Sequence, residues 1–336
     1  GIGCASKTGI LIKGSNYLEA LNNVQTIIFD KTGTLTEGIF KVTKIVPHNG
    51  FSERELLEKA AYAECFSNHP IAESIKKAYN LSVEQKDIQS FEEIAGLGVK
   101  VKFKDNEILA GNSGLMVKEN IKFPDNNEMG TVIHVAVDKV YAGYILISDV
   151  IKNDSKKAIY GLKALGLHKI AMLTGDNNAV AEKVGKELDI DEIYSELLPE
   201  DKVNKLEEIS AQNSYRDKIA FVGDGINDAP VLARSDIGIA MGGLGSDAAI
   251  EVADIVIMTD EPSKIVTGIR IAKWTRKIVI QNIVFALDVK ILFLLMGAFG
   301  IATMWEAVFA DVGVALIAIL NSMRALNLPK NKKMAD

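Results

Sequence analysis

The sequence is short of cysteine and of basic charge, and each shortage excludes a class of protein. Only two cysteines, Cys4 and Cys65, occur in the 336 residues, and they lie far apart. This spacing supports neither a disulfide framework nor a cysteine-rich zinc site, and we expect plain thiols in a reducing compartment. Lysine and arginine number 38 against 44 aspartate and glutamate residues, giving a formal net charge of -6. No broad basic surface is available, so we expect no nucleic-acid partner.

Apolar residues are plentiful and are concentrated near the C-terminal end. The mean hydropathy of +0.14 is high for a chain in which 24% of residues are charged. Residues 282–301 and 305–323 form two apolar stretches, close to the ~20 residues with which a helix crosses a bilayer. Basic residues flank the outer ends of this pair, at Lys273, Arg276, Lys277, Arg324, Lys330, Lys332 and Lys333. The positive-inside rule predicts a transmembrane hairpin over residues 280–323 with both outer ends cytoplasmic. The alternative is a buried helical pair in a soluble protein.

Residues 24–40 and 151–265 carry the alternating pattern of a parallel sheet with helices. Short β-branched runs such as "VQTIIF", "HKIAMLT" and "DKIAFVG" alternate with amphipathic helical stretches. We predict a doubly wound α/β domain in two sequence segments. Several runs end in Asp, or in Thr or Gly followed by Asp. In such sheets the ligand lies beyond the carboxyl ends of the strands, so these acidic residues should converge there.

Residues 41–150 have a different pattern, which predicts an inserted α+β domain. Ser52 and Glu55 form a capping box that opens a helix. Later, "TVIHVAVDKVYAGYILI" alternates around an Asp-Lys turn, as in a β-hairpin. Insertion of this domain splits the doubly wound domain in two.

The stretch "GIGCASKTG" near the start resembles a phosphate-binding loop but fails its requirements. The Walker pattern needs Gly before the Lys, and here Ser6 precedes Lys7 with no strand before it. We interpret the match as chance.

Asp30 is the strongest candidate for a catalytic residue. It ends the apolar run of "TIIFDKTGTLTEG" and enters a loop of Thr and Gly with free backbone N–H groups. A carboxylate held in this way is a suitable nucleophile for a phosphoryl group. Such chemistry also needs a cation, a positive charge and donors for the phosphoryl oxygens. The motifs "LTGD", "LLPEDK" and "VGDGINDAP" offer these groups.

These motifs together resemble those of the P-type ATPases, whose phosphorylation domain belongs to the haloacid dehalogenase superfamily. "DKTGTLT" matches the family signature, while "SNHPIAESI" and "GLGV" resemble motifs of the heavy-metal-transporting class. The resemblance covers essentially the whole chain. It implies a haloacid dehalogenase-like phosphorylation domain, with residues 41–150 as the nucleotide-binding domain. It also implies ATP and Mg²⁺ as cofactors.

The resemblance also implies roles for individual residues. Asp30 is the phosphorylated residue and a magnesium ligand, and Thr32 lends its carbonyl to the magnesium. Thr174 and Lys202 hold the phosphoryl group, Asp224 is a magnesium ligand, and Asn227 and Asp228 support that site. Asp149 and Lys152 match the hinge between the domains. The implied nucleotide-site residues are Glu64, His69, Gly96, Gly98, Gly111, Asn112, Gly175 and Asp176.

The chemistry of the Thr32 side chain bears on how long a phosphorylated Asp30 would last. Many soluble phosphatases of this superfamily place a second Asp two residues after the nucleophile, where it acts as general acid and base. A threonine cannot do this. We therefore expect the aspartyl phosphate to persist until another domain delivers a base.

Ionisable residues in the apolar stretches indicate an ion pathway. Lys290 in "ALDVK" and Asp311 in "FADVG" resemble the zinc, cadmium and lead exporters, and we predict that they face each other near mid-membrane. The Met-Ser-Ser pattern of the copper pumps is absent from the sequence. We therefore expect export of Zn²⁺, Cd²⁺ or Pb²⁺, with a copper pump or a phosphatase of small phosphate esters as alternatives. A non-enzymatic nucleotide-binding remnant is a third possibility.

Two parts of a complete pump do not occur in the sequence. It contains neither a Cys-Pro-Cys helix nor a Thr-Gly-Glu actuator motif, and residues 1–23 resemble the link that follows that helix. We expect the C-terminal half of a pump that binds ATP and phosphorylates itself. Its expected partners are membrane lipid and the missing N-terminal transmembrane and actuator portion. The expected location is a bacterial cell membrane, with both soluble domains cytoplasmic.

Overall fold

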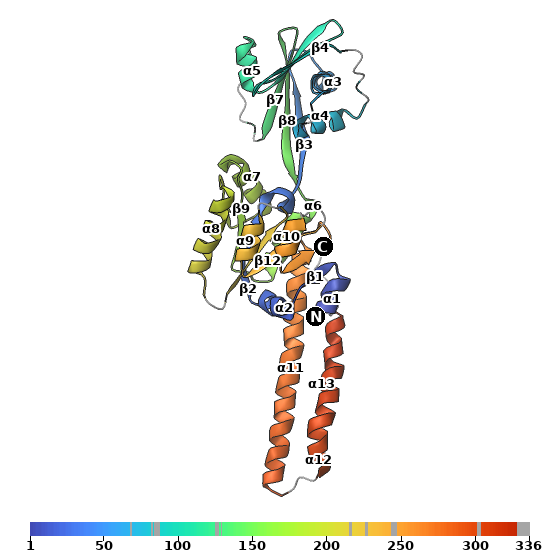
Figure 1. Cartoon of the computed structure of the whole chain (residues 1–336), viewed down its shortest axis with the longest axis vertical. Coiled ribbons are helices and arrows are strands. Elements are labelled where there is room, and N and C mark those ends of the chain that lie inside the picture. The colour runs from blue at the N-terminus through green and yellow to red at the C-terminus, as the bar shows by residue number, and fades with distance from the viewer. Residues whose placement is uncertain are drawn as a thin grey trace. The chain divides into compact units, whose positions relative to one another are not determined.

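The chain forms two compact units (Figure 1). The computed structural model describes residues 1–67, 69–81, 83, 88–124, 128, 130–214, 217–225, 228–242, 247–300 and 304–327. One unit comprises Gly1–Leu35 with Lys152–Asp336, and the other comprises Thr36–Ile151. The first boundary lies five residues before the predicted one at residues 40 and 41. The reason is that strand β3 (Thr36–Pro47) begins at once and pairs along its length with β8 (Val140–Ile151).

The first unit contains a seven-stranded sheet with the order β1-β13-β12-β11-β2-β9-β10. Neighbouring strands are parallel except β1, which is antiparallel to β13. This confirms the predicted α/β class. The strands are β1 (Ile10–Ile12), β2 (Val24–Asp30), β9 (Lys169–Leu173), β10 (Glu192–Tyr194), β11 (Lys218–Gly223), β12 (Ile237–Met241) and β13 (Ile255–Ile257).

Helices alternate with these strands along the chain and bury their apolar runs. They are α1 (Ile2–Lys7), α2 (Ser15–Asn22), α6 (Asn153–Ala164), α7 (Asn178–Leu188), α8 (Pro199–Gln212), α9 (Ala229–Arg234) and α10 (Asp247–Val252). On the sheet, Ile28 and Phe221 are completely buried and cluster with Leu206 of α8 and Val231 of α9. A parallel sheet must be covered on both faces, which explains why its strands read as continuous apolar runs. The "GIGCASKTG" stretch folds into α1, so it forms no phosphate-binding loop.

The second unit is a six-stranded antiparallel sheet with the order β3-β8-β7-β6-β5-β4. Its remaining elements are α3 (Glu53–Ala63), α4 (Pro70–Tyr79), β4 (Ile88–Ile94), β5 (Gly98–Phe103), β6 (Asn106–Gly111), α5 (Ser113–Lys118) and β7 (Thr131–Val137). The predicted capping box is present, because Ser52 and Glu55 bond reciprocally at the start of α3. The predicted hairpin joins β7 to β8 through Asp138 and Lys139, with φ of 48° and 66°. Positive φ at both central residues is the turn whose twist matches paired strands.

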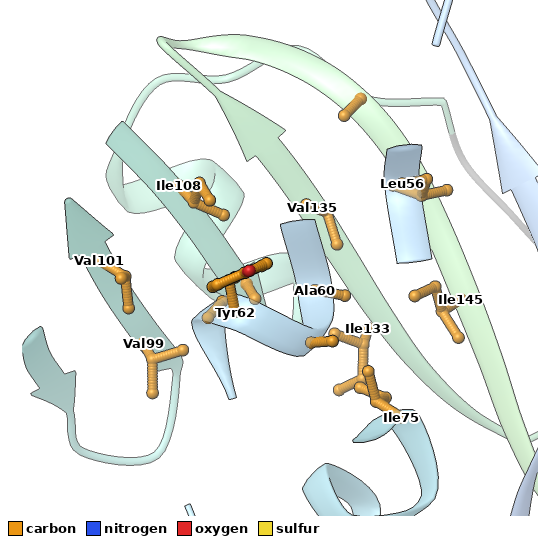
Figure 2. Close-up of a cluster of buried hydrophobic side chains, with 14 of the residues drawn as sticks. Leu56, Ala60, Tyr62, Ile75, Val99, Val101, Ile108, Ile133, Val135 and Ile145 are labelled. Carbon is orange, nitrogen blue, oxygen red and sulfur yellow. The ribbon is translucent and has the colours of Figure 1, made fainter. Parts of the chain in front are cut away.

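This unit has a hydrophobic core of its own (Figure 2). Figure 2 shows Ala60 and Tyr62 of the α3 segment facing Val99, Val101 and Ile133 of the sheet. The Tyr62 ring lies 3.9 Å from that of Phe103, measured between centroids. Burial of each such side chain contributes about 1.5–3 kcal/mol, so the unit does not depend on the first one for its apolar burial.

The C-terminal part consists of two apolar helical stretches drawn side by side in Figure 1. They are α11 (Lys264–Ala298), followed by α12 (Met304–Val308), a wider turn over Phe309–Gly313, α13 (Val314–Ser322) and a last turn over Met323–Leu326. Both stretches are long and apolar enough to cross a membrane, and only 6% and 12% of their most apolar windows are buried. Apolar side chains such as Leu294 and Phe299 therefore face outward, which contradicts the alternative of a buried pair in a soluble protein.

Candidate functional site

Asp30 lies at the carboxyl end of β2, an interior strand of the seven-stranded sheet. It is paired with Leu173 of β9 on one side, and Phe29 is paired with Val222 of β11 on the other. The loops that follow β9 and β11 therefore leave the sheet on either side of Asp30. Those loops carry Thr174 and Asp224, which confirms that parallel strands gather these motifs at one edge.

Lys202, on the first turn of α8, binds two of the carboxylates at this edge. Its Nζ donates to Asp30 Oδ1 at 2.5 Å and to Asp228 Oδ1 at 3.0 Å. All three residues are buried. Asp224 completes the cluster, because Asp30, Asp224 and Asp228 each offer a carboxylate oxygen within 4.8 Å of the others. Lys202 thus contacts two of the three clustered carboxylates.

Burial and the neighbouring charges change the pKa of the groups involved. Burial, followed by the charge of Asp228, raises the pKa of Asp30 to about 7, although Lys202 acts in the opposite direction. Burial and Asp228 likewise raise the pKa of Asp224 to about 6. Burial alone would lower the pKa of Lys202, but Asp30 and Asp228 together raise it above its usual value.

The loop after Asp30 leaves room for Asp224 by means of a glycine. Gly33 has φ +74°, and a Cβ there would lie 1.7 Å from Asp224 Oδ2. Lys152 Nζ donates to the Gly33 carbonyl and also pairs with Asp260 Oδ1 at 2.6 Å. Lys152 thereby connects the loop after Asp30 to Asp260. Within the described part of the chain, the buried hydroxyl of Thr34 has no hydrogen-bond partner.

These features fit a magnesium ion. Mg²⁺ binds oxygen ligands and is usually held by one or two carboxylates together with phosphate and water. The carboxylates of Asp30, Asp224 and Asp228, whose oxygens lie within 4.8 Å of one another, supply such a donor set, and Gly33 lets the Asp224 carboxylate approach the loop after Asp30. Of the predicted metal residues, Asn227 lies outside the described residues, and Thr32 is exposed at the start of the loop.

In the Thr-Gly-Asp motif, Thr174 and Asp176 make different contacts. Thr174 is buried after β9, and its Oγ1 accepts a hydrogen bond from the backbone N–H of Asp176 at 3.1 Å. Asp176 itself pairs with the buried Lys31 at 2.6 Å, which joins the loop after Asp30 to the loop after β9. Gly175 packs its backbone near the Leu197 carbonyl, where a Cβ would approach to 3.3 Å. Asp176 therefore has a structural partner in this unit, which its predicted cofactor role did not include.

In the second unit, Glu64 lies at the end of helix α3 and His69 lies at the start of helix α4. Glu64 follows α3 and is 8% exposed, and burial raises the pKa of its carboxyl. His69 is the N-cap of α4, where its Nδ1 accepts from the backbone N–H of Ile71 at 3.3 Å. An accepting Nδ1 leaves the proton on Nε2, so the exposed edge of the ring is a donor.

The predicted glycines of this unit allow a close approach between backbone segments. A Cβ on Gly98 would lie 2.2 Å from the Ala110 carbonyl, and one on Gly111 would lie 2.2 Å from the Leu97 carbonyl. Asn112 fixes the same turn, because its Nδ2 donates to the Gly96 carbonyl at 2.9 Å. Its Oδ1 accepts from Leu115 N and caps α5. Gly96, Gly98, Gly111 and Asn112 thus form one connected turn.

Lys290 and Asp311 lie in the two apolar stretches, and the structure does not pair them. Both side chains are exposed, and within the described residues neither makes an ion pair. Asp311 belongs to the wider turn over Phe309–Gly313. Such one-turn widenings of a helix are frequent at functional sites. The predicted facing of the two residues remains a prediction.

Sequence reasoning missed the supports of the site. The ion pair between Lys31 and Asp176 and the contacts of Lys152 with Gly33 and Asp260 were not predicted. The adjacency of Lys31 to Asp30 was the available signal, but no motif pointed to Asp260.

Comparisons with known proteins place these observations in a family context. Residues 24–236 match the model for haloacid dehalogenase-like hydrolases. The chain is 60% identical to a cadmium, zinc and cobalt-transporting ATPase of Bacillus subtilis, covering 99% of this chain and 47% of that protein. It is 56% identical to a zinc-transporting ATPase of Synechocystis sp., covering 96% and 45%. The chain therefore spans about half the length of these relatives.

Two solved structures are similar to the chain as well. The crystal structure of a zinc-transporting PIB-type ATPase in its E2.Pi state matches with a TM-score of 0.87 and 35% identity, covering 97% of this chain and 54% of that one. The catalytic domain of the CPx-ATPase CopB-B matches with a TM-score of 0.59 and 34% identity, covering 79% and 96%.

Proposed function

Because the chain belongs to the haloacid dehalogenase-like hydrolases, and within them to the heavy-metal-transporting P-type ATPases, we propose that it carries the ATP-driven part of a divalent metal pump. The observation that carries the proposal is the position of Asp30. It lies at a strand end, bound by Lys202 and beside the carboxylates of Asp224 and Asp228, with Thr32 two residues later. This is a phosphoryl-accepting site without its own general base.

Phosphorylation of Asp30 follows from the properties of these groups. An oxygen of the Asp30 carboxylate forms a bond to the γ-phosphorus of ATP, and the bond to the β–γ bridging oxygen breaks so that ADP leaves with its electrons. The carboxylate needs no base for this attack. Lys202 neutralises charge on the transferred group, while the buried Thr174 hydroxyl is placed to bind its oxygens. Magnesium, held by Asp30, Asp224 and the Thr32 carbonyl with Asn227 and Asp228 in support, would supply further positive charge.

We assign nucleotide binding to the second unit. Glu64, His69 and the turn of Gly96, Gly98, Gly111 and Asn112 offer a buried carboxyl, an imidazole donor and closely approaching backbone. The N-terminus of α4 adds backbone N–H groups that favour anions. Together these groups suit a purine nucleotide and its phosphates.

Zinc or cadmium is the proposed cargo, because the relatives are named for these ions. Lead and copper are less favoured, since the names of the Bacillus subtilis and Synechocystis relatives include neither ion. We propose that Lys290 and Asp311 belong to the ion pathway and that both soluble units are cytoplasmic. The remaining partners are membrane lipid and the N-terminal portion that full-length relatives contain.

The experiment that tests the function separates a pump from a phosphatase. With magnesium and ATP labelled at the γ-phosphate, the chain should accumulate a phosphoenzyme, because Thr32 cannot activate water. Thr32→Asp supplies the missing general acid and base, whose contribution is typically about 10²–10⁴-fold. We expect this variant to lose its label at least about tenfold faster in a chase.

Thr32→Asn is the matched control, since asparagine has nearly the same shape as the aspartate of Thr32→Asp but cannot act as a general acid or base. Its label should persist as in the parent. Rapid turnover of para-nitrophenyl phosphate by the parent, without any accumulated label, would establish the phosphatase alternative instead.

His69 offers a test of the nucleotide site. His69→Asn retains an acceptor close enough to cap α4 but removes the Nε2 donor. A hydrogen bond to a charged group contributes about 1.5–3 kcal/mol, so ATP affinity should fall about 10- to 100-fold. Isothermal titration of the full chain measures this.

The melting temperature without ATP is the control, because the retained cap should keep it near that of the parent. Unchanged ATP affinity in His69→Asn would exclude this residue from the nucleotide site.

A further inference from the structure

Helix α11 is one continuous helix from the α/β layer of the first unit to the far end of the apolar hairpin (Figure 1). Its first turns are buried through Ile265, Ile269 and Ala272. Val266 packs closely on α6, where a Cβ on Gly161 would approach it to 2.9 Å. With 35 residues, α11 is ~52 Å long. Any displacement of the α/β layer can therefore reach the hairpin along a single element.

Apolar contacts alone do not hold α13 in one position along α11. The rings of Phe293 and Phe309 meet edge to face at 6.3 Å between centroids. Apolar side chains attract one another hardly more than they attract lipid tails, so such contacts permit sliding and rotation. A unique register needs directional bonds.

Asn282 provides these bonds from the middle of α11. Its Oδ1 accepts from Asn321 Nδ2 at 2.7 Å, and its Nδ2 donates to Ser322 Oγ at 2.9 Å and to the Ala318 carbonyl at 3.1 Å. Both ends of the amide are thus bound by α13. A slip of one residue rotates the helix by ~100° and would break all of these bonds at once.

A second set of polar contacts joins the two helices nearer the start of the hairpin. We call these contacts and the Asn282 bonds together the lock. Asn321 Oδ1 accepts from Arg324 Nη1 at 2.7 Å, and the Arg324 guanidinium lies 5.2 Å from the Trp274 ring. The indole N–H of Trp274 donates to the Arg324 carbonyl at 3.2 Å. Trp274 precedes Asn282 by two turns on α11, so the two helices are joined at two levels.

The lock also sets the depth of the two ionisable residues of the proposed pathway. Lys290 lies eight residues beyond Asn282, or ~12 Å along α11. Asp311 lies ten residues before Asn321, or ~15 Å along the facing stretch. The register that these bonds select therefore brings Lys290 and Asp311 to nearly the same level.

We propose that Asn282 and Asn321 are positioning residues that lock the Asp311 stretch to α11 in one register. The lock keeps Lys290 and Asp311 level and links the ion pathway to the element that enters the phosphorylation unit. This rests on the proposed pump function.

The register is measured with a pair of spin labels in the full chain. Labels at Ile291→Cys and Val312→Cys are both on exposed positions beside the two ionisable residues, in a background with Cys4 and Cys65 replaced by alanine. Double electron–electron resonance in lipid nanodiscs should give one narrow distance distribution. Asn282→Leu and Asn321→Leu should each broaden it at least about twofold or add a second distance. The double variant should be no broader than either single one, because the two residues share a bond.

Gln281→Leu is the matched control, since Gln281 neighbours Asn282 and accepts a long bond of 3.5 Å from Arg324 Nη1, which keeps its 2.7 Å bond to Asn321 in this variant. It should keep the narrow distribution, and labelling of Asp30 by ATP should be unchanged in every variant. A parent-like distribution in Asn282→Leu would overturn the proposal.

A second measurement connects register with ion transport. In a pump assembled from this chain and the N-terminal portion of the Bacillus subtilis relative, Asn282→Leu should lower zinc-stimulated ATP hydrolysis at least about tenfold with phosphorylation preserved. Full stimulation despite a broadened distribution would overturn the positioning role. Lack of zinc stimulation in the unmodified pump would instead count against the proposed function, while the distance measurement still decides the lock.

Discussion

Asp30→Asn is expected to abolish labelling of the chain by γ-labelled ATP. The amide has the shape of the carboxylate but lacks the nucleophilic oxygen, so labelling should fall at least about a hundredfold, equivalent to ~2.7 kcal/mol or more in the barrier. The parent label should be stable in acid and released by hydroxylamine, as for an acyl phosphate. Acid precipitation followed by gel electrophoresis measures both properties.

The loss should not arise from unfolding. The neutral amide removes one of three crowded carboxylates, while Lys202 keeps its contact with Asp228. Thermal unfolding should therefore show a variant about as stable as the parent. Asp236→Asn is a matched control, because Asp236 binds Lys218 and Ile219 N at the opposite end of β11, and it should keep full labelling. Equal labelling of Asp30→Asn and the parent would refute the assignment of the nucleophile.

Asp311→Ala should have the largest effect on transport. A carboxylate within an apolar span is costly unless it faces a polar pathway, and Asp311 lies in a widened turn of its helix. Removing it should reduce zinc-stimulated ATP hydrolysis in the assembled pump by at least about fiftyfold, as expected when a charged ligand worth ~2.3 kcal/mol or more is lost. Phosphorylation of Asp30 by inorganic phosphate should persist, since that reaction does not require the transported ion to be bound.

Asp288→Ala is the comparison for this variant. Asp288 is two positions from Lys290, so the two side chains point ~200° apart around α11. We expect Asp288→Ala to keep most of the zinc stimulation. A well-folded Asp311→Ala pump with unchanged zinc stimulation would remove Asp311 from the pathway and leave the apolar hairpin without its proposed ligand.

The proximity of Asp30, Asp224, Asp228 and Lys202 could be predicted from the sequence, because it follows from the geometry of a parallel sheet. Parallel strands present their carboxyl ends at a single edge, so motifs that follow such strands meet there whatever the loop details. The capping box at Ser52 and the hairpin turn at Asp138 were predictable for a similar reason, because each is a local pattern with a local cause.

Features that depend on side-chain direction could not be predicted. The sequence places Lys31 next to Asp30, but only the fold turns its ammonium toward Asp176. Lys152 and Asp260 are 108 residues apart, and no periodicity links them. Hydropathy located the apolar end of α11 but not its start at Lys264, because the first turns are amphipathic and bury their apolar face within the first unit. Asn282 appears in the sequence only as an amide at the edge of an apolar stretch.

The central claim is that Asp30 accepts the phosphoryl group from ATP, and peptide mapping of the phosphoenzyme tests it most directly. Borohydride reduces an aspartyl phosphate to homoserine, so the modified position can be read by mass spectrometry after digestion. The account predicts homoserine at residue 30 in the parent incubated with magnesium and ATP. Homoserine at Asp176, Asp224 or Asp228 instead, with residue 30 unmodified, would contradict it.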